Sequence, residues 1–159
     1  MKRMMALVYA VLVTLGLGAD PLNLGILHVY DEVNDNSTPY LGYFKDAYSS
    51  QGIAYDQVTI AELKTADLER YDTIVIHAMV MAFNMKSPVR DWLKTRPPLA
   101  GKKTYLFVTA NRWFLEKLYG QLTELLDGNT ELDAVSMATK DLDETAKKAA
   151  VQAQVNKLR

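Results

Sequence analysis

The chain contains no cysteine among its 159 residues. Disulfide bonds, cysteine-ligated zinc, iron–sulfur clusters and a lipid-modified cysteine are therefore excluded. An excess of charge of one sign is also missing, because 18 lysines and arginines stand against 19 aspartates and glutamates, a formal net charge of −1. No block or stripe of basic residues breaks this balance, so the sequence gives little support to a nucleic-acid partner.

Internal repeats and low-complexity linkers are absent from the sequence as well. A length of 159 residues suits one domain and is short for two. Hydrophobic residues make up 49% of the chain, which provides for a full core and argues against disorder. The composition therefore predicts one globular domain.

The N-terminal segment, residues 1–19, has the layout of a secretory signal peptide. A basic start, Met1–Arg3, precedes an apolar run over residues 4–18, and a polar stretch begins at Asp20. The run is short for a membrane span, although a retained anchor stays open, as does a buried first strand or helix. We expect a signal peptide or N-terminal anchor followed by a domain over residues 20–159. The protein would then be exported, periplasmic or extracellular, or membrane-anchored.

A β-α-β unit forms the centre of the domain. Residues 72–79 (DTIVIHAM) and 104–109 (TYLFVT) are continuous apolar runs, typical of strands that are covered on both faces of a parallel sheet. Between them, Ser87 is a good N-cap residue and Pro88 suits the first position of a helix. A strand, a helix and a second strand in this order predict a right-handed crossover.

The remaining elements continue the alternation of strands and helices. The connection over residues 61–70 has room for about one helical turn. Five strands that alternate with helices predict a doubly wound, three-layer α/β sandwich. The other strands are expected at residues 24–30, 53–60 and 132–137, and the other helices from Thr38, over residues 113–126 and after an N-cap at Asp141 or Asp143.

Three stretches resemble the flavodoxin family. YDTIVIHAMVMAFNMKSPVRDWLK (residues 71–94) and LAGKKTYLFVT (99–109) are similar to the middle of that family, and ILHVYDEVNDNSTPYLGYFKDAYSSQGI (26–53) is similar to its opening. The resemblance covers residues 24–156. It implies a five-stranded parallel sheet of order 2-1-3-4-5, with a ligand cleft outside the carboxyl ends of strands 1 and 3. It also implies FMN as cofactor and electron transfer as activity.

The family's first loop binds the FMN phosphate through hydroxyls, a glycine and backbone N–H groups, in the pattern S-x-T-G-N-T. Here only Asn36 and the hydroxyl of Ser37 match that pattern, and Asp35 replaces the glycine. With Asp31 and Glu32 it makes three carboxylates that would repel a dianion. A solvated acidic loop that caps the helix is therefore favoured over a working phosphate cradle. The cofactor-binding positions that the resemblance implies in this loop are Asn34, Asp35, Asn36, Ser37 and Thr38.

Two further loops would hold the flavin ring. Met81 stands where the family has an aromatic residue, and Phe83 stands where it has a glycine. Phe83 and Trp113 are both able to stack on a flavin, and Arg112 is the cation that the topology places near the cleft. The methionine-rich segment around Met81 is equally consistent with a core plug or with a partner-binding patch.

His28 and His77 lie on strands that the topology makes neighbours. With Asp31 they could form a metal site, but both are embedded in apolar runs, which favours satisfied core histidines. No arrangement of serine, histidine and aspartate stands out as a nucleophilic triad. We therefore predict no metal ligands and no catalytic residues.

The sequence thus favours an exported flavodoxin-like domain with a degenerate FMN site that acts as a binding or interaction module. Its partner would be an unknown protein or a small anionic or aromatic ligand, with membrane contact only through residues 4–18. The alternative is an FMN-binding, flavodoxin-type electron carrier or an FMN-dependent reductase. No residue suggests a substrate pocket for a reductase, so the chain is expected not to be an enzyme in its own right.

Overall fold

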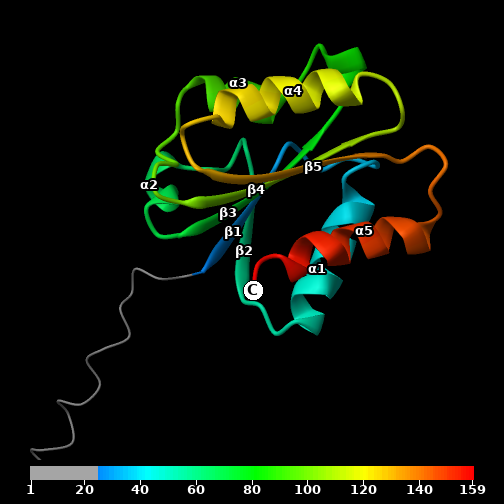
Figure 1. The fold of residues 1–159 in the computed structure, drawn as a ribbon, viewed down its shortest axis with the longest axis horizontal. Helices are drawn as coiled ribbons and strands as arrows, with labels where there is room; N and C mark the ends of the chain where they lie inside the picture. The colour runs from blue at the N-terminus through cyan, green and yellow to red at the C-terminus, as the bar shows by residue number, and fades with distance from the viewer. Residues whose placement is uncertain (1–24) are drawn as a thin grey trace, which may run out of the picture.

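The computed structural model describes residues 25–159. The predicted signal peptide or anchor, residues 1–19, and Leu24 of the first predicted strand lie outside the described residues. Figure 1 shows strands and helices that alternate along the chain. The elements are β1 (Ile26–Tyr30), α1 (Thr38–Ser50), β2 (Tyr55–Thr59), α2 (Thr65–Leu68), β3 (Thr73–Met79), η1 (Ala82–Asn84), α3 (Pro88–Lys94), β4 (Lys103–Ala110), α4 (Leu115–Leu126), β5 (Glu131–Ala138) and α5 (Glu144–Asn156).

Within residues 25–159, five strands form one parallel sheet in the order β2-β1-β3-β4-β5. The predicted fold class and strand order are confirmed. Tyr30 of β1 is in register with His77 of β3, which is in register with Phe107 of β4. Every residue of β3 after Thr73 is buried, as expected for a central strand with helices on both of its faces.

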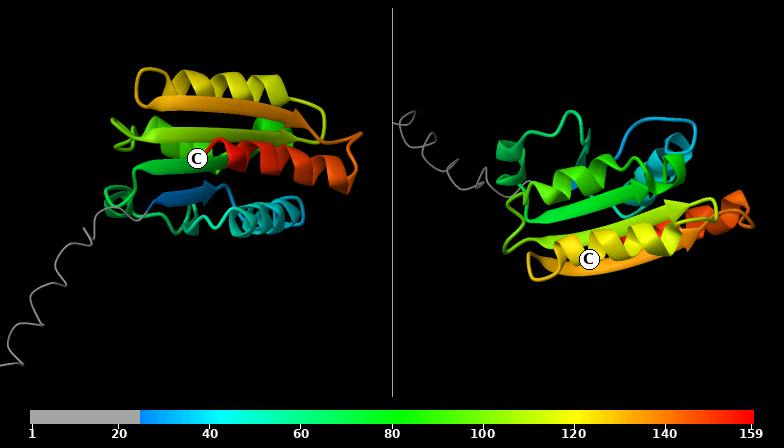
Figure 2. Two further views of the ribbon diagram at one scale, coloured as in Figure 1. Left: turned by 60° about the horizontal axis from the view of Figure 1, so that its bottom comes forward. Right: turned by 90° about the horizontal axis from the view of Figure 1, so that it is seen from above.

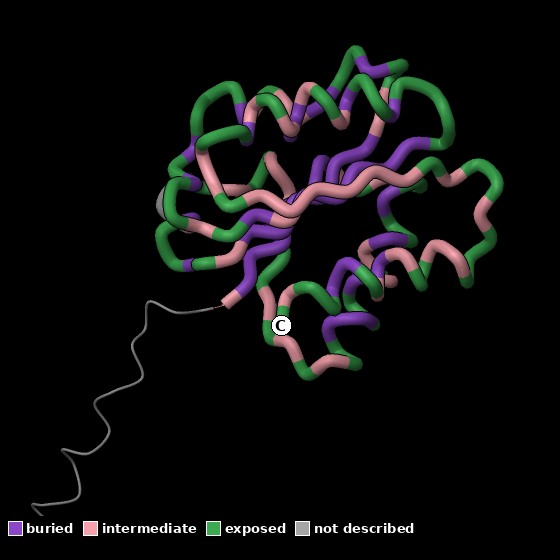
Figure 3. Tube along the Cα trace, in the orientation of Figure 1, coloured by how far each residue is buried: buried purple, intermediate pink, exposed green. Residues whose placement is uncertain are grey.

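Helices cover both faces of the sheet. Helices α1 and α5 lie on one face, and α3 and α4 lie on the other, as the views in Figures 1 and 2 show. Phe44 and Val151 belong to the core under α1 and α5, and Leu118 and Val89 belong to the core under α4 and α3. Each of these four side chains is fully buried, which stabilises the fold by about 1.5–3 kcal/mol per side chain. Figure 3 shows this buried layer along the central strands.

Local signals set the helix ends. The Ser87 hydroxyl accepts a hydrogen bond from the Arg90 N–H at 3.1 Å, which confirms it as the N-cap of α3. Asp143, rather than Asp141, caps α5 by accepting the Ala146 N–H at 2.7 Å. The helix expected from Trp113 begins at Leu115 instead, because Phe114 has a left-handed backbone with φ of 63°.

The carboxyl ends of the parallel strands lie at one edge of the sheet. The loops that follow β1, β3, β4 and β5 therefore meet there, and this edge holds the residues singled out from the sequence. None of the helices in residues 25–159 has the length and apolar character needed to cross a membrane.

Candidate functional site

Asp31 directly follows β1, and its side chain is buried in the protein. Its side chain is 3% exposed, and its carboxylate accepts the N–H of Met79 at 2.7 Å and the N–H of Val89 at 2.9 Å. Burial raises the pKa of Asp31 to about 6, although the two hydrogen bonds act in the opposite direction. The expectation that this carboxylate crowds the phosphate position is therefore wrong, because it ties β1 to β3 and α3.

The carboxylate of Glu32 is also engaged away from the position expected for the FMN phosphate. Its carboxylate pairs with the amine of Lys86, which joins the β1–α1 loop to the β3–α3 loop. The hydrogen bond from Lys86 holds the pKa of Glu32 below its ordinary value. Of the three acids in the loop, only Asp35 remains exposed toward the sheet edge.

Asn34 closes the β1–α1 loop on itself. Its side-chain oxygen accepts the backbone N–H of Asn36 at 2.9 Å and that of Ser37 at 3.0 Å. The Ser37 hydroxyl accepts the N–H of Asn34 at 2.9 Å and donates to the carbonyl of Glu32 at 2.7 Å. The Thr38 hydroxyl donates to the carbonyl of Asn34 at 2.8 Å. The N–H groups of Asn36 and Ser37 and the hydroxyls of Ser37 and Thr38, which could face an anion at this helix N-terminus, are thus already paired within the loop.

The β3–α3 loop carries an unusual backbone. Ala82, Phe83 and Asn84 have positive φ angles of 46°, 54° and 66°, a conformation that is strained for residues other than glycine. The guanidinium of Arg90 supports them by donating to the Asn84 carbonyl at 3.1 Å, the Asn84 side-chain oxygen at 3.1 Å and the Gln121 side-chain oxygen at 3.0 Å. Sequence reasoning missed this support, although Arg90 stands within the stretch that resembles flavodoxins.

The aromatic residues of the two ring loops lie on the surface. Phe83 is 75% exposed and Trp113 is 71% exposed. The Phe83 ring meets the Phe114 ring edge to face, with 6.3 Å between their centroids, so the two loops contact one another. The Arg112 guanidinium lies 5.4 Å from the centre of the Trp113 ring. Met81 is bridged to Lys86 across the same loop.

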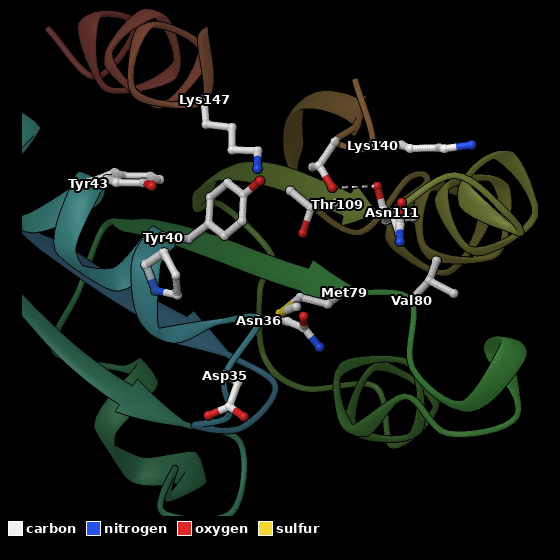
Figure 4. A pocket seen from close by; sticks show the side chains of 13 residues that line it. Asp35, Asn36, Tyr40, Tyr43, Met79, Val80, Thr109, Asn111, Lys140 and Lys147 are labelled. Carbon is white, nitrogen blue, oxygen red and sulfur yellow. Dashed lines mark hydrogen bonds between the residues drawn. The ribbon is translucent and has the colours of Figure 1, made fainter. Parts of the chain in front are cut away.

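A cavity of about 480 Å³ opens beside this loop cluster, between α1 and α5 and above the ends of β3, β4 and β5 (Figure 4). Of the predicted site residues, it receives Asp35 and Asn36. Asn34, Ser37 and Thr38 lie in the adjoining closed loop, and Met81, Phe83, Arg112 and Trp113 lie outside the cavity. The lining residues are Asp35, Asn36, Pro39, Tyr40, Tyr43, Met79, Val80, Thr109, Ala110, Asn111, Thr139, Lys140 and Lys147.

Two buried histidines lie behind the cavity. Nε2 of His77 is 3.2 Å from the Thr109 hydroxyl, and burial lowers the pKa of His77 to about 3. Burial also lowers the pKa of His28, and neither ring nitrogen of His28 has a hydrogen-bond partner among residues 25–159. The histidines lie in the core as expected, but neither is fully satisfied among the described residues, because Nδ1 of His77 lacks a partner as well. Asp31 bonds elsewhere, so it does not join them in a cluster.

Neither the protein-family models nor the curated protein sequences match this chain. Solved structures do match. Flavodoxin 2 from Bacillus cereus, in its oxidised form, has a TM-score of 0.63 and 15% identity over 84% of this chain and 98% of its own. A flavodoxin from the domain Archaea gives 0.59 and 12% over 84% and 98%, and the Megasphaera elsdenii flavodoxin gives 0.59 and 15% over 82% and 98%.

This chain has a flavodoxin-like fold. At 11–15% identity among five flavodoxin structures, the likeness extends to the fold alone. FMN is the cofactor that the sequence resemblance implies. Its phosphate would have to displace the side chain of Asn34 from the N–H groups of Asn36 and Ser37 and lie beside the carboxylate of Asp35.

The cavity residues outside the β1–α1 loop were not predicted as site residues from the sequence. Tyr40 and Tyr43 lie on α1, where the sequence pattern predicts that aromatic side chains belong to the core. Lys147 has the pattern of an ordinary charged surface residue of α5. The flavodoxin-like topology could have indicated the position of this cavity, because it places the carboxyl ends of β4 and β5 beside that of β3.

Proposed function

We propose that this chain is a flavodoxin-like binding domain that does not hold FMN and is not a redox enzyme in its own right. The observation that carries the proposal is the pair of hydrogen bonds from Asn36 N–H and Ser37 N–H to the side chain of Asn34. A phosphate bound there would have to replace both bonds, each with a net stability of about 0.5–1.5 kcal/mol.

Charge adds to this barrier. Asp35 is exposed and stands where the flavodoxin pattern has a glycine, and a phosphate dianion within about 4 Å of it would meet a repulsion of a few kcal/mol at the effective dielectric of a protein surface. The side chain of Asp35 also fills the space that a glycine would leave for close approach of the backbone.

The same sheet edge offers apolar surface for a partner. The exposed large hydrophobic residues of the described chain all lie in loops at this edge, namely Val33, Phe83, Met85, Trp113 and Phe114. Exposed apolar side chains that lie together on a protein surface are typical of interaction sites. They support a binding role in which the loop edge, rather than a flavin, makes the contact.

Export belongs to the same proposal. A basic start and an apolar run over residues 4–18 are typical of a secretory leader. Expression in a bacterial host should give a protein whose mass lacks residues 1–19, and an intact N-terminus would contradict cleavage.

The alternative function is an FMN-dependent electron carrier. It is favoured by the exposed rings of Phe83 and Trp113, one on each of the two loops that would flank a flavin ring. An FMN titration of the full chain, followed by quenching of flavin fluorescence, decides between the two functions. We expect no saturable quenching with the unmodified chain, whereas tight quenching would refute the binding-domain proposal.

A variant of the β1–α1 loop tests whether these loop residues are what excludes the FMN phosphate. The triple substitution Glu32→Ser, Asn34→Thr and Asp35→Gly restores the flavodoxin pattern and leaves Asp31 in place. We expect this variant to bind FMN at least tenfold more tightly than the unmodified chain. Riboflavin, which lacks the phosphate, is the matched control ligand and should show no such gain. An equal gain for both ligands would show that the phosphate is not what the loop rejects.

A further inference from the structure

The cavity between α1 and α5 contains an inward-pointing cation. Figure 4 shows the amine of Lys147 and the hydroxyl of Tyr40 pointing toward one another, whereas the side chain of Lys140 extends away from them. Among residues 25–159, the Lys147 amine makes no ion pair, although Lys148, its neighbour on α5, pairs with Glu144 at 2.6 Å. Lys147 is half-buried, so its charge acts on the cavity with less screening than a fully exposed amine would have.

The hydroxyl of Tyr40 is a buried donor without a close acceptor. Tyr40 is 6% exposed, and no acceptor in the described part of the chain lies within hydrogen-bond distance of its hydroxyl. Burial raises the pKa of Tyr40 to about 12, although the nearby Thr139 side chain acts to lower this pKa, so the hydroxyl keeps its proton at neutral pH. A buried polar group of this kind is destabilising unless it finds a partner, which points to an acceptor that enters the cavity.

A ligand oxygen between the two groups would satisfy both. The Lys147 amine is a donor only, and the Tyr40 hydroxyl has a proton to give. The Thr109 hydroxyl lies in the same lining, where it contacts Nε2 of the buried His77 at 3.2 Å. Charge and donors therefore converge on a single acceptor group that carries one negative charge.

Part of the lining is apolar. Pro39, Met79 and Val80 and the ring of Tyr43 border the cavity, and its volume of about 480 Å³ lies in the range of small-molecule sites. Asp35, on the α1 side, disfavours a ligand with a second negative charge. This excludes a phosphate dianion on the same grounds as in the β1–α1 loop.

From this juxtaposition we infer that the cavity binds a small aromatic monocarboxylate, with its carboxylate against the Lys147 amine and the Tyr40 hydroxyl and its ring against Tyr43, Met79 and Val80. The inference deepens the proposed binding function by naming a ligand class. None of Met81, Phe83, Arg112 and Trp113, the cofactor-binding positions predicted in the two other loops, takes part in it.

The test uses benzoate as the probe and the full chain, with saturation-transfer NMR and a titration to measure affinity. Benzyl alcohol, which has the same ring without the charge, is the control probe. We expect saturable binding of benzoate at least tenfold tighter than that of benzyl alcohol. Lys147→Gln should weaken benzoate binding about tenfold, equal to about 1.4 kcal/mol. Tyr40→Phe, which keeps the ring in the core, should weaken it several-fold.

Lys157→Gln is the matched control, because this lysine at the end of α5 is paired with Asp133 and does not line the cavity. It should leave benzoate affinity unchanged, and thermal unfolding should confirm that all three variants fold. No benzoate binding, equal binding of the two probes, or equal effects of the two lysine variants would overturn the inference. FMN quenching by the unmodified chain would instead refute the proposed function, and it is a separate measurement.

Discussion

The carboxylate of Asp31 accepts the backbone N–H of Val89, a residue 58 positions later in the chain, at 2.9 Å. With a second bond from the N–H of Met79 at 2.7 Å, it joins the end of the first strand to the central strand and to the start of α3. The loops of the candidate site are therefore anchored from beneath by one buried acid.

Replacing Asp31 by Ala should destabilise the fold. The change leaves the N–H groups of Met79 and Val89 buried without an acceptor, at a cost of about 1–3 kcal/mol for each group. Urea unfolding at pH 5, below the pKa of Asp31 in the fold, measures the loss. Glu32→Ala removes a partly exposed ion pair in the same loop and should change stability by less than about 1 kcal/mol. Equal losses for the two variants would contradict the structural role of Asp31.

The same pair of proteins should show a pH dependence. The pKa of Asp31 is about 6 in the fold against an ordinary value of 3.8, so between these values the folded state holds the extra proton. The stability of the unmodified chain relative to Asp31→Ala should therefore fall as pH rises from 4 to 6.5, by about 3 kcal/mol at most. A difference that stays constant or grows over this range would contradict the raised pKa.

Replacing Arg90 by Lys should loosen the β3–α3 loop. Lysine keeps the charge but cannot reproduce the fork that contacts Asn84 and Gln121, and we expect a loss of about 1–3 kcal/mol. Hydrogen exchange at the backbone N–H of Asn84 should accelerate. Lys94→Gln, on the exposed side of the same helix, is the control and should leave this exchange rate unchanged.

Replacing Phe83 by Gly should stabilise the fold. Its φ of 54° is strained for phenylalanine and accessible to glycine, and its ring is largely exposed, so we expect a gain of about 0.5–1 kcal/mol in thermal unfolding. Phe83→Ala removes the ring but keeps the strained Cβ, and it should give no gain. A loss of thermal stability in Phe83→Gly would show that the contact with Phe114 outweighs the strain.

The fold followed from local signals in the sequence. Continuous apolar runs gave the buried strands, Ser87 and Pro88 gave the start of α3, and the resemblance to flavodoxins supplied the strand order. One helix start was predicted too early, at Trp113. The helix begins later because Phe114 has a left-handed backbone, which the pattern of side chains does not predict.

The candidate site was predictable only in part. The sequence located the loops, but it could not say which way a side chain at a strand end turns, so Asp31 was counted with the exposed acids although it is buried. Nor could it show that Asn34 would occupy the donors of its own loop. Lys147 and Tyr40 line one cavity because α5 packs beside α1, two helices that are far apart in the sequence.

The direction of β1 gives the domain a polarity. The described chain enters the sheet at Ile26, on the amino edge, whereas the cavity and the exposed rings of Phe83 and Trp113 lie at the carboxyl edge. Five strand residues separate these edges by about 17 Å, from a rise of about 3.3 Å per residue. The loops of the proposed binding function therefore lie at the opposite end of the sheet from the point where the described chain enters it.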